Sequence, residues 1–168
     1  MNTLDIENGV EELSSPEALA EVLERAELVE HRLEPSAADL RAALEVREAL
    51  RALLLANTGV EIEAAALGPL ERAARAGQLA ARFSVGGDAE LVAEAPGVDG
   101  ALGRLVALVL AARANGSLER LKACRRDVCH WVFYDRSRNR ASHWCSMSVC
   151  GNRTKTKAYR RRLSAPAG

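Results

Sequence analysis

The sequence predicts a mainly helical N-terminal domain with one small β-hairpin, followed by a small C-terminal module built from a second β-hairpin and a helix. Three observations lead to this fold class. Apolar residues recur at helical spacing through most of residues 1–117, an alternating stretch interrupts them at 81–93, and all four cysteines lie near the C-terminus. We therefore divide the chain into residues 1–117, 118–163 and a disordered tail at 164–168.

Two helices with serine caps are expected at the start of the front domain. Ser15 precedes a proline, and Glu17 is placed for a capping box, so the first helix should begin here. Ser36 starts the second helix with Asp39 at its third position, and Asn57-Thr58-Gly59 ends it. Both helices carry leucine and valine at helical spacing, as expected for elements that pack around one core.

The rest of the front domain changes from helix to strand and back. A third helical stretch covers about 60–76, with Gly68-Pro69 predicted to split or kink it. Apolar residues then alternate over 81–93 on either side of Gly86-Gly87, which predicts a β-hairpin. Asp99 is expected to cap a further apolar helix that leads towards the cysteines.

The front domain shows none of the familiar catalytic motifs. It has no phosphate loop, serine nucleophile elbow, His-Glu-x-x-His motif or dinucleotide fingerprint. Its single histidine, His31, stands at a charged helix end and is expected on the surface. We therefore expect no enzymatic activity. Two alternatives stay open: an enzyme with a small-molecule site between the front helices and the hairpin, and a ligand sensor without chemistry.

Charge divides the chain at the same place. Residues 1–117 carry 10 Lys and Arg against 20 Asp and Glu, whereas residues 118–168 carry 13 against 3. The formal net charge of zero therefore hides a front half at −10 and a tail at +10. Such asymmetry indicates two units with different partners. One alternative is that the acidic unit docks on the basic one and competes with a polyanion for it.

The first residues, Met-Asn-Thr-Leu-Asp, have no basic start and no apolar run after them, so we expect no signal peptide. The longest strongly apolar stretch, Leu105–Ala112, is too short to cross a bilayer. We therefore expect a cytoplasmic protein without a membrane partner. Thiols stay reduced in that compartment, which favours metal binding over disulfides.

The cysteines form two Cys-x4-Cys pairs. Cys124 and Cys129 make the first pair, and Cys145 and Cys150 make the second, with fifteen residues between the pairs. Two close thiol pairs held apart by the length of one hairpin suit the four corners of a tetrahedral Zn²⁺ site. Residues 118–163 are too few for a conventional core, and a structural zinc contributes about 10–16 kcal/mol to the folding of such a segment.

Other uses of these cysteines are weaker alternatives. His130 and His143 flank ligands, so a Cys₃His site is open, although four thiols suffice and both histidines are expected to line the hairpin surface. Iron–sulfur binding is the lesser metal alternative. Thiol catalysis is weaker still, because a closed site has no free nucleophile.

The segment between the pairs is expected to form a hairpin, with residues 130–134 and 141–144 as its strands and 135–139 as its turn. Trp131, Phe133 and Trp144 would then shield the metal from water. A helix starting near Ser148–Cys150 would follow. This order resembles a treble-clef zinc finger.

The terminal helix carries a run of cations. Arg153, Lys157, Arg160 and Arg161 fall along one face at helical spacing. Such a surface is typical of proteins that bind nucleic acid, although a soluble basic tail without a partner is the bland alternative. The candidate nucleic-acid contacts are Arg136, Arg138, Arg140, Asn152, Arg153, Lys155, Lys157, Arg160, Arg161 and Arg162.

These motifs match two known families. Leu121–Arg162 resembles the CGNR zinc finger, named for a motif present here at 150–153. The front domain resembles the ABATE domain that usually precedes this finger, through Asn2-Thr3-Leu4-Asp5 and the Ser-Pro-Glu-Ala-Leu helix start. The finger match includes the first cysteine pair, Phe133-Tyr134-Asp135, Ser137-Arg138-Asn139, Trp144-Cys145-Ser146-Met147, and Lys157 with the arginines after it.

The resemblance implies a bacterial, stress-induced transcription regulator whose finger holds one structural zinc on Cys124, Cys129, Cys145 and Cys150. We therefore expect DNA as the partner of the finger. The front domain is expected to be a sensor or dimerisation unit, with a homodimer because many regulators bind paired half-sites, and with a small-molecule effector. The alternative is a zinc-stabilised protein-interaction module, or an RNA binder.

Overall fold

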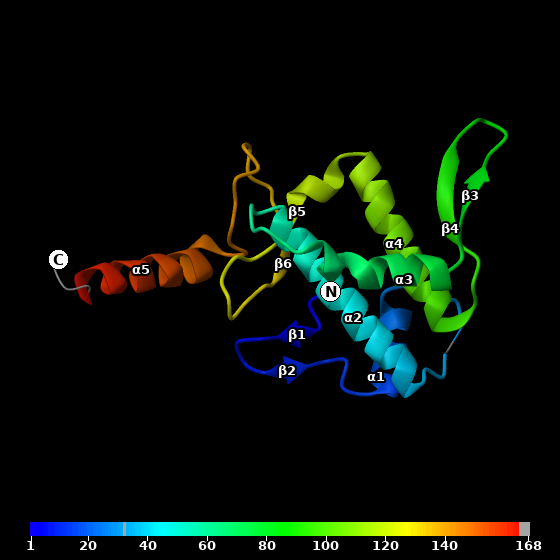
Figure 1. Ribbon diagram of the computed structural model, residues 1–168, viewed down its shortest axis with the longest axis horizontal. Helices are drawn as coiled ribbons and strands as arrows, with labels where there is room; N and C mark the ends of the chain where they lie inside the picture. Colours follow the sequence, from blue (N-terminus) through cyan, green and yellow to red (C-terminus); the bar gives the residue numbers. More distant parts are fainter. Residues whose placement is uncertain (32, 165–168) are drawn as a thin grey trace.

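Five α-helices and three two-stranded antiparallel sheets make up the described part of the chain, residues 1–31 and 33–164, in the computed structural model (Figure 1). The side chains of residues 158 and 161–164 lie outside the description. The fold is mixed α/β, and it contains an N-terminal hairpin that the sequence does not predict. The elements follow one another as β1 (Leu4–Asp5), β2 (Val10–Glu11), α1 (Pro16–Arg25), α2 (Ala37–Ala56), η1 (Ala64–Leu67), α3 (Gly68–Ala76), β3 (Leu79–Phe83), β4 (Ala89–Ala93), α4 (Gly97–Ala114), η2 (Ser117–Arg120), β5 (Leu121–Ala123), β6 (Val132–Tyr134), η3 (Met147–Gly151) and α5 (Asn152–Ser164).

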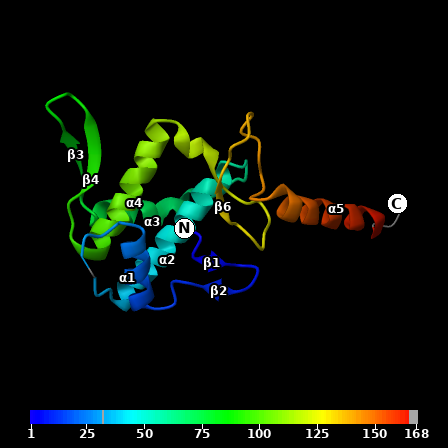
Figure 2. The same cartoon turned by 180° about the vertical axis from the view of Figure 1, so that it is seen from behind.

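The main core lies where α1, α3 and α4 meet α2, on the side of the molecule away from α5 (Figure 2). A second, smaller cluster of Leu54, Leu118 and Ala123 joins the end of α2 to β5. The first strand of the cysteine-containing module therefore packs directly on the front domain. The main core is filled by Leu13, Leu19, Leu23, Ala43, Val46, Leu50, Ala73, Val98, Ala101, Leu102 and Val106.

Serine caps fix the starts of α1 and α2, as predicted. Ser15 Oγ accepts a hydrogen bond from the backbone amide of Ala18 at 3.2 Å. Ser36 and Asp39 form a full capping box, in which each side chain accepts from the backbone N–H of the other residue. The capping box predicted for α1 is wrong, because the third position of that helix is Ala18 rather than Glu17.

The start of α4 also differs from the prediction. Pro96 is its N-cap and no side chain caps it. Asp99 lies inside the first turn, where a carboxylate meets the positive end of the helix dipole instead of an unpaired N–H. The predicted split of the third helical stretch is confirmed, since η1 ends at Leu67 and α3 begins at Gly68.

The predicted front hairpin forms and projects from the body (Figures 1 and 2). β3 pairs with β4, with Ala81 opposite Leu91. Near the base of this hairpin α3 and α4 cross closely at two glycines. A Cβ atom built on Gly103 would lie 2.9 Å from Gly77 Cα, so the crossing needs glycine.

The hairpin predicted within the C-terminal module is wrong. β6 pairs with β5, which precedes the first cysteine, in the register Ala123 opposite Val132. Residues 141–144, the predicted partner strand, form no strand. Instead this part of the chain wraps the buried Lys122 side chain, whose Nζ donates to the backbone carbonyls of Arg140 and Ser142. A buried ammonium must be paired, so the loop supplies its acceptors.

The helix predicted to start near Ser148–Cys150 is confirmed. A π-helical turn, η3, runs directly into α5, and Ser146 caps it by accepting from the Val149 amide at 3.3 Å. Of the tail predicted to be disordered, 165–168 lies outside the described residues and Ser164 is the last residue of α5. Within the described part of the chain, no helix is long and apolar enough to span a membrane.

Candidate metal centre and basic surface

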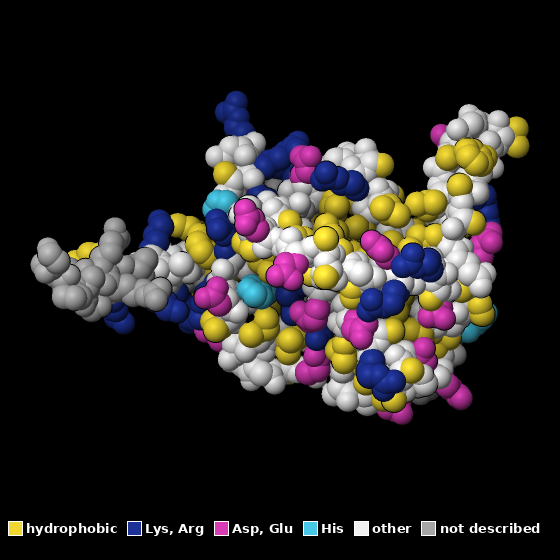
Figure 3. All heavy atoms as spheres, in the orientation of Figure 1, with side chains coloured by type: hydrophobic (Ala, Val, Ile, Leu, Met, Phe, Trp, Pro, Cys, Tyr) yellow, Lys and Arg dark blue, Asp and Glu magenta, His cyan; other side chains and the backbone are white. Residues whose placement is uncertain are grey.

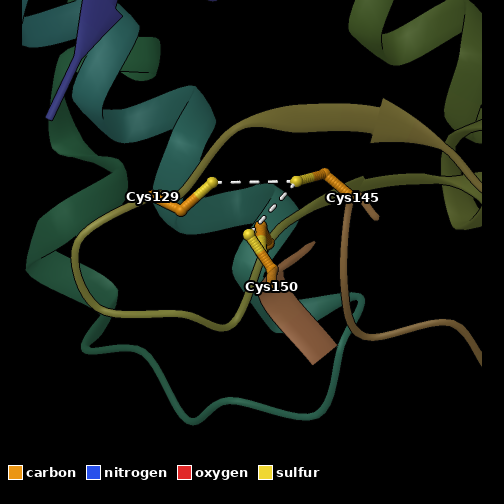
Figure 4. Close-up of side chains that lie close together, drawn as sticks. Cys129, Cys145 and Cys150 are labelled. Carbon is orange, nitrogen blue, oxygen red and sulfur yellow. Dashed lines mark hydrogen bonds between the residues drawn. The ribbon is translucent and has the colours of Figure 1, made fainter. Parts of the chain in front are cut away.

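The four cysteine side chains converge on one point. Cys124 follows β5, Cys129 precedes β6, Cys145 precedes η3 and Cys150 lies within η3. Their four Sγ atoms all lie within 4.8 Å of one another. Figure 4 shows Cys129, Cys145 and Cys150 turned towards a common centre, with 3.7 Å between Sγ of Cys129 and Cys145 and 3.7 Å between Sγ of Cys145 and Cys150.

These distances fit one tetrahedral ion. A Zn–S bond of about 2.3 Å places the corners of a tetrahedron about 3.8 Å apart, close to the two distances observed here. A disulfide would instead need about 2.05 Å, and all four cysteines are free. Within the described residues the cluster contains no histidine, so neither His130 nor His143 belongs to it. The predicted Cys₄ donor set is therefore brought together, with thiolate chemistry suited to zinc.

Two of the free thiols, Cys129 and Cys145, resist ionisation in this cluster. Burial raises the pKa of Cys129 to about 11 and also raises that of Cys145, where the neighbouring thiols add to the effect. Burial acts in the same direction at Cys150, but the pKa of this thiol is lowered because Arg126 and the other thiols hydrogen-bond to it. Arg126 Nη1 donates to Cys150 Sγ at 3.9 Å. A cation is needed to hold four thiolates together, and a metal dication supplies it.

A buried ion pair, which the sequence analysis missed, supports the module beside the cysteines. Lys122 Nζ donates to Asp135 Oδ2 at 2.8 Å, and the two side chains are 3% and 1% exposed. Asp135 also accepts from the backbone amides of Ser137 and Ser142. Burial would raise the pKa of Asp135, but the bond from Lys122 and the bonds from the loop lower it well below its usual range. The available signal was an aspartate directly after the β-favouring stretch 132–134 and a lysine shortly before the first cysteine.

The predicted basic helix has most of its described side chains on the surface. Arg153, Lys155 and Lys157 lie on the surface of α5, which extends away from the body (Figure 1). Asn152 and Arg160 are exposed on the same helix. Figure 3 shows Lys and Arg on the described part of this helix and on the loop beside it, whereas the front domain carries both acidic and basic side chains. The side chains of two further candidates, Arg161 and Arg162, lie outside the described residues.

The loop candidates divide into two kinds. Arg136 and Arg138 are exposed. Arg140 is paired within the module, since its Nη1 lies 2.8 Å from Glu119 Oε2. Its backbone is left-handed, with φ of 52°, which turns the chain back towards Lys122. The loop and α5 therefore belong to the same module, but not every candidate nucleic-acid contact in the loop is free of a partner within the protein.

Side chains of the front domain hold the module in place. Asn2 completes the edge of β6: its Nδ2 donates to the Val132 carbonyl at 2.9 Å and its Oδ1 accepts from the Val132 amide at 2.8 Å. Asn57, at the end of α2, donates to the carbonyls of Leu118 and Leu121. Both contacts give backbone groups the partners they need where two domains meet.

An apolar groove of about 660 Å³ lies between the β3–β4 hairpin and α4. Three leucines on its walls, Leu91, Leu108 and Leu110, are 40–59% exposed. Arg104 also lines it, and its Nη1 donates to the Leu28 carbonyl at 3.0 Å. This is the region between front helices and hairpin where a small-molecule site was considered from the sequence.

Comparison with known protein families gives two matches that together cover most of the chain. Residues 120–163 match the CGNR zinc finger. Residues 1–121 match ABATE, a family described as "Putative stress-induced transcription regulator". A comparison with curated proteins finds no match. Both resemblances seen in the sequence are confirmed, and the four clustered cysteines of the finger fit one structural zinc ion. The chain therefore belongs to the ABATE family and carries a C-terminal CGNR zinc finger.

Proposed function

We propose that the chain is a transcription regulator whose zinc finger binds duplex DNA through α5 and the loop of residues 136–140. The observation that carries this function is the exposure of Arg153, Lys155 and Lys157 on a helix that extends away from the Cys₄ cluster (Figure 1). Neighbouring like charges destabilise a helix by about 0.2–0.5 kcal/mol per pair. Phosphates remove that cost, because they neutralise the cations and release counterions.

Zinc has a structural role in this function. The finger is treble-clef-like: a β-hairpin contributes the first ligand pair around its turn, and a helical turn contributes the last ligand. Cys150 lies in the η3 turn that runs directly into α5, so the bound ion fixes the direction in which the basic helix leaves the module. A closed Cys₄ site has no open coordination position. We assign no reaction to the chain.

The front domain is the regulatory unit in this proposal, and it acts in a stress response. We assign its groove between β3–β4 and α4 to contact with a second copy of the chain, because exposed leucines line both sides of it. A two-fold dimer would present two fingers to paired half-sites. Sedimentation of the zinc-loaded protein should show a dimer that Leu108→Lys dissociates. A monomer whose thermal stability rises with small metabolites would instead assign the groove to an effector.

Duplex binding by the full-length, zinc-loaded protein tests the function. Fluorescence anisotropy with a labelled random-sequence duplex should give an affinity that falls steeply with salt, with a log–log slope of roughly −0.9 for each phosphate neutralised. Lys157→Gln should weaken binding and leave the zinc content unchanged. Arg113→Gln, which removes the same charge from an exposed position on α4, is the matched control and should bind like the wild type.

Other partners would give different results. Equal affinities for single-stranded RNA and duplex DNA, with Lys157→Gln weakening only the RNA complex, would support an RNA binder. Association that is independent of salt, or no association with any nucleic acid, would rule out the regulator and favour a protein-interaction module.

A further inference from the structure

Two arginines of the finger converge on one carboxylate of the front domain. Glu7 stands in the exposed turn between β1 and β2. Arg126 donates from Nη1 to Glu7 Oε2 and from Nη2 to Glu7 Oε1, both at 2.8 Å. Arg153 donates from Nη1 to Glu7 Oε1 at 2.7 Å. The two cations outnumber the single carboxylate between them, so Glu7 alone does not neutralise both arginines.

The two sides of this contact are held very differently. Arg126 belongs to the loop between the first two cysteines, is 16% exposed, and also donates to Cys150 Sγ. Arg153 is in the first turn of α5, three residues after Cys150. The cysteine cluster therefore holds the Arg126 guanidinium group directly, and it fixes the start of the helix that carries Arg153. Glu7 is 41% exposed, and it lies in a turn between strands of only two residues each. The two arginines belong to the finger, whereas the carboxylate that they bind is on a short surface turn.

A carboxylate and a phosphodiester present the same feature to a guanidinium group, namely two anionic oxygens that accept parallel hydrogen bonds. We propose that Arg126 and Arg153 form a binding slot for one backbone phosphate of the duplex, and that Glu7 fills this slot in the unbound protein. This inference rests on the proposed function. Glu7 is then an intramolecular competitor, and duplex binding releases the β1–β2 turn from the finger.

The competition between Glu7 and a duplex phosphate couples the two domains. If duplex binding displaces Glu7, anything that stabilises the docked β1–β2 turn must weaken duplex binding by the same factor, because linkage is reciprocal. The competition is modest, since exposed ion pairs are weak. We expect removal of the Glu7 charge to tighten duplex binding about 3- to 10-fold.

Anisotropy titrations of the zinc-loaded, full-length protein with the same duplex at fixed salt test the slot. Glu7→Gln should bind about 3- to 10-fold more tightly than the wild type. The matched control is Glu12→Gln, because Glu12 is 44% exposed and pairs with Arg25 of the front domain, away from the finger. It removes the same charge and should leave affinity within about twofold of the wild type. Adding Arg153→Gln to Glu7→Gln should abolish the gain.

A second measurement is independent of affinity. Amide hydrogen exchange over residues 5–11 should become faster when duplex is added to the wild type, because the turn loses its anchor. Equal or weaker binding by Glu7→Gln, or unchanged exchange at saturating duplex, would overturn the slot while leaving the DNA-binding function intact. A gain shared by Glu12→Gln would reduce the effect to net charge and would also overturn it. Absence of duplex binding by both wild type and Glu7→Gln would overturn the proposed function itself.

Discussion

Asp135→Asn removes the negative partner of a buried lysine while keeping the shape of the side chain. Lys122 and Asp135 are 3% and 1% exposed and lie 2.8 Å apart, so the variant leaves an ammonium group without its counter-charge. Removing one partner of a buried ion pair costs about 3–5 kcal/mol. In the wild type, Lys122 and the backbone amides of Ser137 and Ser142 donate to the carboxylate. The asparagine side chain would turn an NH₂ group, itself a donor, towards some of these donors.

Zinc affinity is the sensitive assay for this loss. Metal binding and folding of a small finger are linked, so the cost of the substitution appears as weaker apparent zinc binding. Because about 1.4 kcal/mol corresponds to a tenfold change, we expect a loss of roughly 10²- to 10⁴-fold in competition with a chromogenic chelator. Asp127→Asn makes the same change at an exposed position of the finger, and it should stay within about threefold of the wild type. An Asp135→Asn variant that also stays within about threefold would refute the importance assigned to the buried pair.

Three further predictions follow from the fold. The pKa of Asp135 is lowered, so its ion pair stabilises the protein fully above the ordinary carboxyl pKa of about 4 and stops doing so as the pH falls below that value. The difference in unfolding free energy between wild type and Asp135→Asn should therefore shrink in acid. A difference that stays constant with pH would contradict an origin in the ion pair. Asn2→Ala should leave both backbone groups of Val132 without their partner, and the Val132 amide should exchange faster by at least about fivefold, whereas unchanged exchange would show that the bond contributes nothing. Gly103→Ala should overpack the crossing of α3 and α4 and cost about 1–3 kcal/mol in urea unfolding, while Gly86→Ala, where a new Cβ has no neighbour within 3.5 Å, should cost less; equal losses would contradict the close approach.

The sequence was sufficient where local chemistry decides structure. Ser36 and Asp39 are three residues apart, and their capping box needs no distant partner. The alternation around Gly86-Gly87 likewise specified a hairpin with its strands in the expected places. The four cysteines were recognisable because their side chains are chemically distinct and their spacing suits one ion.

The sequence was insufficient where a distant partner decides. Residues 141–144 were predicted to be the returning strand, yet β6 pairs with β5 because Lys122, on β5, reaches Asp135 and the loop that follows it. Such a pairing depends on burial, which composition near the turn does not reveal. Arg126 was not among the candidate contacts for the same reason. Its relation to Glu7 joins residues that are 119 positions apart.

Arg140 shows that a run of basic residues does not identify which of them contact a ligand. Its position in a basic loop suggests a phosphate contact, but the structure pairs it with Glu119 and places it in a left-handed turn. Arg136 and Arg138, in the same loop, are exposed. A run of arginines therefore predicts a basic surface more reliably than it predicts which members are available to a ligand.

Metal analysis of the purified, reduced protein tests the central claim most directly, which is that one ion held by Cys124, Cys129, Cys145 and Cys150 organises the finger. Native mass spectrometry should find one zinc per chain, and a strong chelator should remove it. Hydrogen exchange should then rise across residues 121–160 and change little in the core around α2. A protein that contains no metal as purified, and whose finger keeps its protection in the presence of chelator, would contradict this account.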